Sequence, residues 1–333
     1  MAVKEAMLYS TEDAKVRCAV CAHQCSIAEN GYGVCRTRQN RDGKLYTLIY
    51  GSVSSAHVDP IEKKPLYHFF PGSFVFSLGT ISCDFRCKHC QNWSISTAKV
   101  GELHTIELSP EDAVRRAREL RCDGIAWTYN EPTIWFEYTY DSAKLAKQAG
   151  LYTVYVTNGY ISEVALNELA PFLDAANVDV KAFSDSFYQK VSGARLQPVL
   201  ETCERMLEKQ IHIELTYLII PGYNDDAEEI QKFADWVVDL NESIPVHFSR
   251  FYPMHLMLDV PPTSIETLEK AHDIAKEAGV EYVYLGNVLG HEYEHTFCPD
   301  CGKVLIERTG YHVRKRISKP ECPACGRPIN IRL

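Results

Sequence analysis

The stretch CDFRCKHCQNW, residues 83–93, places three cysteines within eight positions of the chain. Three thiols cannot all pair among themselves, and a structural zinc ion normally takes four ligands. The spacing C-x3-C-x2-C therefore indicates a metal-binding loop in which one coordination position stays open. We expect Cys83, Cys87 and Cys90 to be catalytic, because an open position lets another molecule reach the metal.

Short apolar segments follow one another along the chain, beginning just before this loop. Between most of them lie stretches typical of helices, such as residues 109–121, where Ser109 can cap a helix that begins at Pro110. After the second segment the alternation repeats roughly every 25 to 35 residues, which is typical of βα units and predicts an α/β fold with a partial or full parallel barrel. The expected strands are residues 74–80, 124–129, 152–157, 176–183, 211–220, 246–252 and 280–286.

Polar residues, glycines and prolines follow these expected strands. In βα barrels the functional groups lie at the C-terminal ends of the strands, so we expect a site along this edge. Glu131 is a strong candidate, because Asn-Glu-Pro directly after an apolar strand has little structural purpose. The segments at the expected strand ends read SCDFRCKHC, NEP, NGY, KAFSD, PGYND and YPMH.

The cysteine loop after the first barrel strand resembles the signature of the radical SAM enzymes. The resemblance implies that Cys83, Cys87 and Cys90 each bind one iron of a 4Fe–4S cluster, whose fourth iron chelates S-adenosylmethionine (SAM). It also implies reductive cleavage of SAM to a 5′-deoxyadenosyl radical, which abstracts hydrogen from an unknown substrate. YNEPT, residues 129–133, is similar to the Gly-Gly-Glu-Pro element of the family. By this match, Asn130 and Glu131 belong to the cofactor site, where Glu131 would hold the SAM ammonium.

Several later segments are similar to parts of the pyruvate formate-lyase activating enzymes. They are VTNG (156–159), VDVK (178–181), IPGYND (220–225) and VHFSRFYP (246–253). The match implies that residues at the third and fourth expected strand ends lie near the SAM carboxylate and that a histidine lies near the adenosyl group. The implied cofactor residues are Thr157, Asn158, Asp179, Lys181 and His247.

Two features qualify this likeness to the activating enzymes. Those enzymes place an aspartate before Thr-Asn-Gly, where this chain has Val156, which argues against a shared cation site. Lys181 could also serve as an ion-pair partner of Asp179 at the rim of a barrel.

Taken with DPIEKKPLYHF and the cysteines at both ends, the chain resembles the AmmeMemoRadiSam-system radical SAM proteins most, a group related to the activating enzymes. The resemblance implies a reductant such as ferredoxin or flavodoxin. It leaves open a small-molecule substrate, a glycyl-radical partner enzyme that the chain would activate, or a Memo-like partner protein.

Two further cysteine groups flank the expected barrel. Cys298, Cys301, Cys322 and Cys325 form two C-P-x-C-G knuckles, which indicates a zinc ribbon, although rubredoxins use the same knuckles to bind iron. Four thiols near the N-terminus can close a zinc site or hold a second 4Fe–4S cluster. Their spacing, C-x2-C-x3-C followed by a cysteine ten residues later, departs from ferredoxin runs and favours zinc. These four are Cys18, Cys21, Cys25 and Cys35.

The cysteine clusters, the apolar runs and the net charge predict the domain division, the compartment and the kinds of partner. The 333 residues divide by these patterns into an N-terminal cysteine-rich module (1–71), a barrel (72–290) and a zinc ribbon (291–333). No apolar run is long enough to cross a bilayer, and clustered cysteines fit a reducing compartment, so we expect a cytoplasmic protein. A net charge of −9 argues against nucleic acid as a partner. The basic residues after Asp300 leave one alternative, a zinc-ribbon adaptor that binds protein or nucleic acid.

Overall fold

The computed structural model describes residues 2–12 and 15–333, and the chain divides into two compact units. The first unit comprises Met1–Asp59, Phe74–Ala176 and Gln197–Ile211. The second comprises Pro60–Ser73, Asn177–Leu196 and His212–Leu333. The division into three segments that the sequence predicts stays a prediction.

Parallel strands form the centre of the first unit. Strand β11 (Gly124–Trp127) pairs in parallel with β9 (Phe74–Gly79) on one side and with β12 (Tyr152–Thr157) on the other. All four residues of β11 are buried, as expected for a parallel strand covered on both faces. Gly124 is required there, because a Cβ atom would come within 2.2 Å of the Tyr152 ring.

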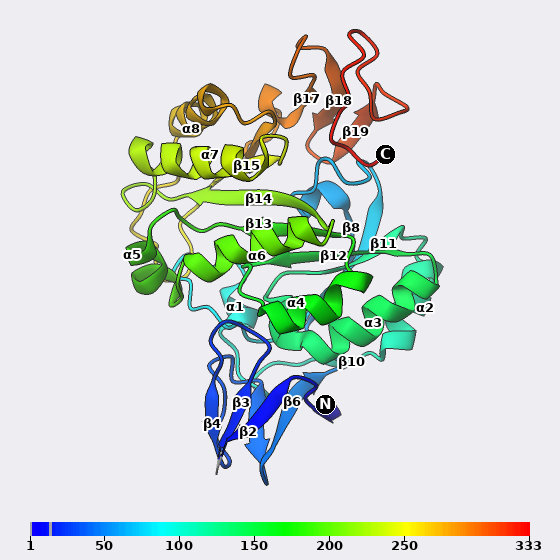
Figure 1. Cartoon of the computed structure of the whole chain (residues 1–333), viewed down its shortest axis with the longest axis vertical. Coiled ribbons are helices and arrows are strands. Elements are labelled where there is room, and N and C mark those ends of the chain that lie inside the picture. Colours follow the sequence, from blue (N-terminus) through cyan, green and yellow to red (C-terminus); the bar gives the residue numbers. More distant parts are fainter. Residues whose placement is uncertain (1, 13–14) are drawn as a thin grey trace. The chain divides into compact units, whose positions relative to one another are not determined.

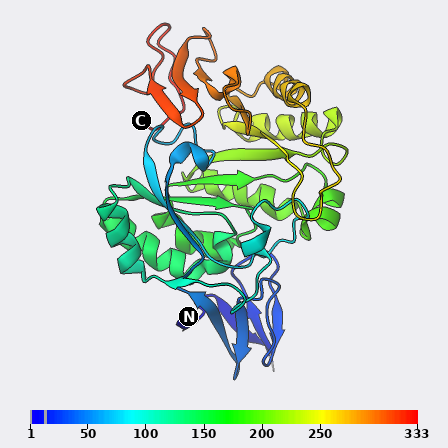
Figure 2. The same cartoon turned by 180° about the vertical axis from the view of Figure 1, so that it is seen from behind.

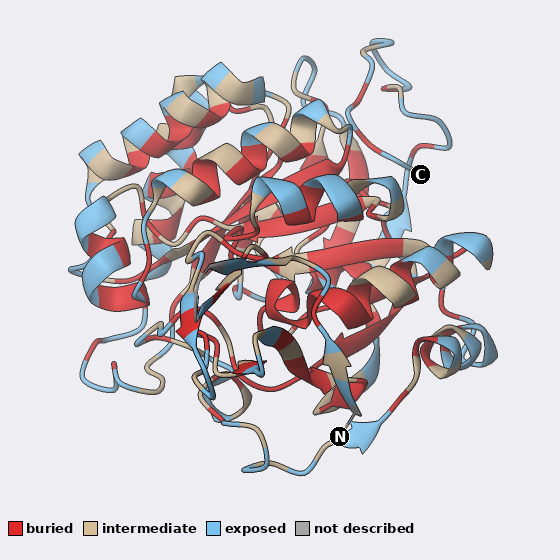
Figure 3. Ribbon diagram, turned by 60° about the horizontal axis from the view of Figure 1, so that its bottom comes forward, coloured by how far each residue is buried: buried red, intermediate tan, exposed pale blue. Residues whose placement is uncertain are grey.

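Helices of the first unit pack on these strands (Figure 1). Helix α2 (Pro110–Glu119) begins as predicted, because the Ser109 hydroxyl accepts a hydrogen bond from the Asp112 amide at 3.1 Å and Pro110 occupies the first helical position. In Figure 3 the strands are mostly buried, whereas the helices expose their outer faces. The other helices are α1 (Trp93–Ser96), α3 (Phe136–Gln148), α4 (Glu163–Leu169) and α6 (Gln197–Glu208), with 3-10 turns η2 (Pro132–Trp135) and η3 (Ala170–Phe172).

Short antiparallel sheets of three strands each precede β9 in the first unit and are blue in Figure 1. One has the order β1-β6-β5 and another the order β2-β3-β4, while β7 pairs with β10. Strand β8 is the neighbour of β9. The bounds are β1 (Ala2–Glu5), β2 (Tyr9–Glu12), β3 (Lys15–Cys18), β4 (Ser26–Ala28), β5 (Arg38–Arg41), β6 (Lys44–Tyr50), β7 (Ser52–Val53), β8 (Ser55–Pro60) and β10 (Ile106–Glu107).

The second unit also contains parallel strands, in the order β16-β15-β14-β13, with β15 paired in parallel to both neighbours. It ends in a small antiparallel sheet, β17-β18-β19, which is orange to red in Figure 2. Strand β13 (Ala175–Asp179) begins in the first unit and ends in the second. The remaining strands of the second unit are β14 (His212–Ile219), β15 (Val246–Arg250), β16 (Val283–Gly286), β17 (Thr296–Phe297), β18 (Val304–Thr309) and β19 (His312–Lys315). Its helices are α5 (Asp185–Phe187), α7 (Ala227–Asn241) and α8 (Ile265–Ala278), with short turns η1 (Ile61–Lys63), η4 (Tyr188–Ser192) and η5 (Glu292–Glu294).

These strands confirm the predicted α/β fold with a parallel sheet. Each of the seven expected strands exists, displaced by at most a few residues at its ends. No helix in the described part of the chain is long and apolar enough to cross a membrane.

Candidate metal centre and cofactor site

The cysteine trio lies in the loop that follows β9, as the sequence predicts. Cys83, Cys87 and Cys90 are half-buried, and none of the three takes part in a disulfide within the described residues. The Phe85 amide donates to the Cys83 sulfur at 3.4 Å, and the Cys90 sulfur lies 3.1 Å from the Ser96 hydroxyl oxygen. The loop therefore already presents thiols and hydrogen-bond partners in the manner of a metal–thiolate loop.

Asn130, which follows β11, holds the start of this loop. Its Oδ1 accepts a hydrogen bond from the Thr80 amide at 3.0 Å, and its Nδ2 donates to the Ser82 carbonyl at 2.7 Å. Both contacts are buried, so the loop has a fixed position relative to the β11 end. The Asn130 side chain is thus a positioning group for the residues before Cys83.

Glu131 joins the ends of β11 and β12. Its Oε1 accepts hydrogen bonds from the Thr133 amide at 2.9 Å and the Thr157 hydroxyl at 2.7 Å, and its Oε2 accepts one from the Asn158 amide at 2.7 Å. The structure therefore brings together Glu131, Thr157 and Asn158, three of the predicted cofactor residues. Because a carboxylate oxygen can accept two hydrogen bonds, Oε2 retains one acceptor position for a ligand.

Asp84, which the sequence reasoning did not single out, places a second carboxyl group near Glu131. Its Oδ1 accepts a hydrogen bond from Asn158 Nδ2 at 2.8 Å. Its Oδ2 is buried and, among the described residues, has no hydrogen-bond partner. A buried acceptor without a partner is costly, so this oxygen is suited to a donor on a ligand. The available signal was a charged residue directly after the first cysteine of a buried loop.

Burial controls the protonation of both carboxyl groups. It raises the pKa of Glu131 to about 7, and the nearby Asp84 carboxylate contributes to the rise. Burial raises the pKa of Asp84 as well, while the hydrogen bond from Asn158 opposes the shift. Two neighbouring buried carboxyl groups favour a positively charged ligand. The charge of such a ligand would lower both pKa values and so favour the ionised carboxylates.

Asp179 and Lys181 lie in the second unit, at and just after the end of β13. The Lys181 ammonium forms an ion pair with the Asp179 carboxylate at 2.6 Å. The Lys181 backbone is also held in place, since its amide donates to the Tyr188 hydroxyl at 3.0 Å. This geometry is the rim ion pair that the sequence left as an alternative, and the role of both residues near SAM stays a prediction.

His247, on β15 of the second unit, is buried against a carboxylate. Its Nε2 lies 2.7 Å from Glu214 Oε2, and the other Glu214 oxygen contacts His212 Nε2 at 3.1 Å. Burial would raise the pKa of Glu214, but the hydrogen bonds from His212 and His247 outweigh it and hold that pKa well below its usual range. The amides of Tyr67 and His68 also donate to Glu214, at 2.9 and 2.7 Å. The adenosyl role of His247 stays a prediction.

The four C-terminal cysteines of the second unit come together. The sulfurs of Cys298 and Cys325 lie 3.6 Å apart, as do those of Cys301 and Cys322, and all four lie within 4.8 Å of one another. A tetrahedral zinc ion with Zn–S bonds of about 2.3 Å holds its sulfurs about 3.8 Å apart. The quartet therefore fits a four-coordinate ion with no open position.

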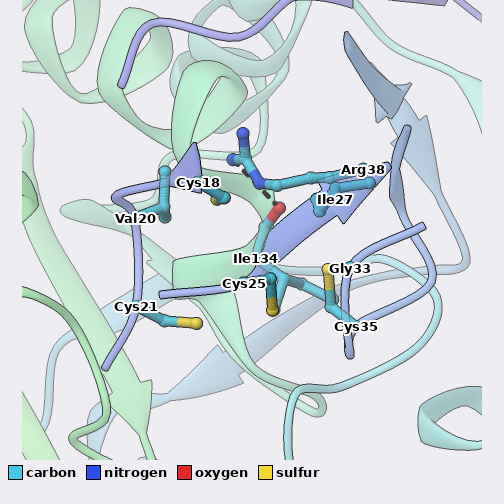
Figure 4. A pocket seen from close by; sticks show the side chains of 9 residues that line it. All are labelled: Cys18, Val20, Cys21, Cys25, Ile27, Gly33, Cys35, Arg38 and Ile134. Atoms are coloured by element: carbon cyan, nitrogen blue, oxygen red, sulfur yellow. Dashed lines mark hydrogen bonds between the residues drawn. The ribbon is translucent and has the colours of Figure 1, made fainter. Parts of the chain in front are cut away.

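The four N-terminal cysteines lie in the first unit and line a small pocket, together with Arg38 and several apolar side chains (Figure 4). Cys18 ends β3, while the other three lie in the loops around β4. Among the described residues, the C-terminal quartet is the only group of three or more candidate ligands whose atoms all lie within 4.8 Å of one another. The N-terminal thiols are therefore spread around their cavity.

Comparisons with known proteins agree with these observations. A model of the Radical SAM superfamily matches residues 78–237. An uncharacterized protein of Methanocaldococcus jannaschii is 45% identical over 334 residues, which cover 99% of each chain. The pyruvate formate-lyase 1-activating enzyme of Escherichia coli K12 is 23% identical over 217 residues, 61% of this chain and 88% of that enzyme. A solved radical SAM methyltransferase from Sphaerobacter thermophilus aligns with a TM-score of 0.52 at 13% identity, over 85% of this chain and 76% of that one, which shows the fold alone.

Proposed function

Because this chain belongs to the radical SAM superfamily, we propose that it cleaves SAM reductively and uses the resulting 5′-deoxyadenosyl radical to abstract hydrogen from a substrate. Cys83, Cys87 and Cys90 would hold a 4Fe–4S cluster, and a reductant such as ferredoxin or flavodoxin would supply one electron per cleavage. When bound, this cluster supplies the electron that breaks a carbon–sulfur bond of SAM. The observation that carries the proposal is the half-buried trio beside two buried carboxyl groups with raised pKa values.

The residues around the trio would bind and orient SAM. Glu131 would accept a hydrogen bond from the SAM amino group at Oε2, its remaining acceptor position. Asp84 Oδ2, which is buried without a hydrogen-bond partner among the described residues, would accept a second. Asn130 would hold the cysteine loop in position through its hydrogen bond to the Ser82 carbonyl. These groups suit a ligand that carries both an amino group and a positively charged sulfonium.

The substrate is proposed at the level of its class. One relative, 24% identical over 217 residues, is named as a putative glycyl-radical enzyme activating enzyme, so an activase of a glycyl-radical enzyme is the first substrate hypothesis. The identity to this relative is low, however, and a small molecule or a Memo-like partner protein remains the alternative. A neighbouring gene for either kind of partner would separate the two.

The C-terminal quartet would bind zinc. The zinc would maintain the shape of the C-terminal module or of a surface for docking. Support comes from the 3.6 Å sulfur pairs, which match a tetrahedral thiolate site and leave no position for a substrate. A zinc-ribbon adaptor without catalysis is the competing function. It offers no reason for the buried Glu131 and Asp84 beside a second group of thiols.

Colour and iron content test the proposal against the adaptor. Protein purified without oxygen should be brown, bind SAM and contain iron in the trio loop. As the matched control, Cys122→Ala removes a lone buried thiol outside the three cysteine groups. Cys87→Ala should lose about four irons, whereas the control should keep them. Colourless wild-type protein that carries only zinc would support the adaptor instead.

A further inference from the structure

The N-terminal cavity is built from four thiols that point at a common space without meeting at one point. Cys18, Cys21 and Cys35 are buried and Cys25 is half-buried. Figure 4 shows their sulfurs on different sides of the cavity, from separate segments of the chain. Apolar side chains and Arg38 close the remaining walls. Thiols that approach a space from different sides suit an occupant that offers each sulfur its own metal atom.

The ribbon in the same chain provides the comparison. Its sulfurs lie as close as 3.6 Å, the spacing that one tetrahedral ion imposes. In a 4Fe–4S cluster each thiolate binds a different iron of the cube, so the sulfurs stand about 6 Å apart. Among the described residues, no three thiols of the N-terminal quartet form a group as close as the ribbon's. The N-terminal spacing therefore departs from the zinc geometry in the direction that a cluster requires.

The environment of the sulfurs also fits a cluster. The Val34 amide donates to the Cys25 sulfur at 3.4 Å, and the Thr37 hydroxyl donates to the Cys35 sulfur at 3.2 Å. Hydrogen bonds to cysteine sulfurs are among the features that tune iron–sulfur clusters. At Gly33, a Cβ would come to 3.7 Å from the Cys25 and Cys35 sulfurs, so this glycine keeps the rim of the cavity free of a side chain.

A buried guanidinium stands beside the thiols. Arg38 is 2% exposed and forms a bidentate ion pair with the buried Glu137, at 2.9 and 2.7 Å. The pair fixes Arg38 in the cavity wall, where its positive charge faces the negative charge of a thiolate-bound group.

We propose that Cys18, Cys21, Cys25 and Cys35 bind a second 4Fe–4S cluster in which every iron has a thiolate ligand. This site is separate from the trio and has no open iron, so SAM does not bind there. The assignment reverses the preference for zinc that the sequence spacing alone favours. The proposal does not depend on the reaction of the trio.

Hydrogen bonds connect the two cysteine sites, and they limit which variants are informative. Ser82, directly before the trio, donates its hydroxyl to the Cys35 carbonyl at 2.6 Å, and His23 Nε2 donates to the Asp84 carbonyl at 3.0 Å. Removing a quartet ligand can therefore disturb the trio loop. The informative variant is the converse one, which removes the trio and leaves the quartet intact.

The test measures iron and zinc per chain in full-length protein reconstituted without oxygen. Wild type should contain about eight irons and one zinc. The triple variant Cys83→Ala/Cys87→Ala/Cys90→Ala should keep about four irons, with the absorption and, after reduction, the electron paramagnetic resonance signal of a 4Fe–4S cluster. Cys203→Ala, which removes a lone buried thiol, should match wild type. A triple variant that folds with no iron and about two zinc ions per chain would overturn the proposal.

A second variant keeps the proposal open to refutation if the triple variant does not fold. Cys21→Ala/Cys25→Ala should lose about four irons and keep its zinc, whereas a zinc site would lose about one zinc and keep all its iron. Unfolding followed by circular dichroism establishes that each variant is folded before its metals are counted.

Discussion

Replacing Glu131 with glutamine should abolish a pH-dependent part of SAM binding. Glu131 is 2% exposed, and burial together with the nearby Asp84 raises the pKa of its carboxyl group to about 7. An acid with a raised pKa is neutral below that value and ionised above it. SAM bound through its amino group favours the ionised form, so the affinity of the wild type for SAM should weaken as the pH falls through about 7.

The magnitude follows from this titration. With a pKa of about 7, the carboxyl is about nine-tenths ionised at pH 8 and about one-tenth ionised at pH 6, so the affinity should fall about tenfold, or about 1.4 kcal/mol. Glu131→Gln keeps the size of the side chain and lacks this titration. At pH 8 the variant should bind SAM more weakly by about 1.5 to 3 kcal/mol, the loss of a charge-assisted hydrogen bond. Between pH 8 and pH 6 the difference between the two proteins should narrow by about 1.4 kcal/mol.

The assay is anaerobic titration calorimetry of SAM into cluster-loaded protein from pH 6 to pH 8. Groups on SAM titrate equally in both proteins, so the difference between the two pH profiles isolates Glu131. Iron content serves as the control, because Glu131 contacts Thr157 and Asn158 and no cysteine. Parallel pH profiles for wild type and variant, or equal affinities at pH 8, would refute the assignment.

Three further predictions concern the metals and the fold. Cys87→Ala should abolish SAM cleavage and remove about four irons, measured by metal analysis, because three thiolates leave no spare ligand; retention of both would contradict the trio assignment. Cys301→Ser should lose about one zinc and lower the melting temperature, because a structural zinc stabilises the folded ribbon; an unchanged melting temperature would argue against a structural role. Arg38→Met should lower the free energy of unfolding in urea by about 3 to 5 kcal/mol, since it leaves the buried Glu137 carboxylate without its ion-pair partner. Restoring neutrality with Arg38→Met/Glu137→Leu should recover much of that loss, and equal stability of wild type and the single variant would show that the pair contributes little.

Local patterns explain which parts of the fold could be predicted. The strands at 74–79 and 152–157 are apolar runs bounded by turn residues, and the cap at Ser109 needs only Pro110 and the polar first turn that follows. The trio was recognisable because its three ligands lie within eight residues. Each of these features depends on neighbours in the chain.

The features that could not be predicted depend on contacts between residues that are far apart in the sequence. Arg38 and Glu137 form a buried ion pair across 99 positions, and no local pattern marks either residue as buried. Asp84 gains its role from Asn158, 74 residues away. The N-terminal quartet shows the same limit, because ligand spacing along the chain does not give the distances between sulfurs in space. Those distances are what separate a single ion from a cluster.

One measurement tests the central proposal most directly: the formation of 5′-deoxyadenosine by cluster-loaded protein given SAM and dithionite, followed by liquid chromatography and mass spectrometry. The account predicts 5′-deoxyadenosine from wild type and from Cys122→Ala, and none from Cys87→Ala. Wild-type protein that carries its full iron content, binds SAM and forms no 5′-deoxyadenosine under reduction would contradict it.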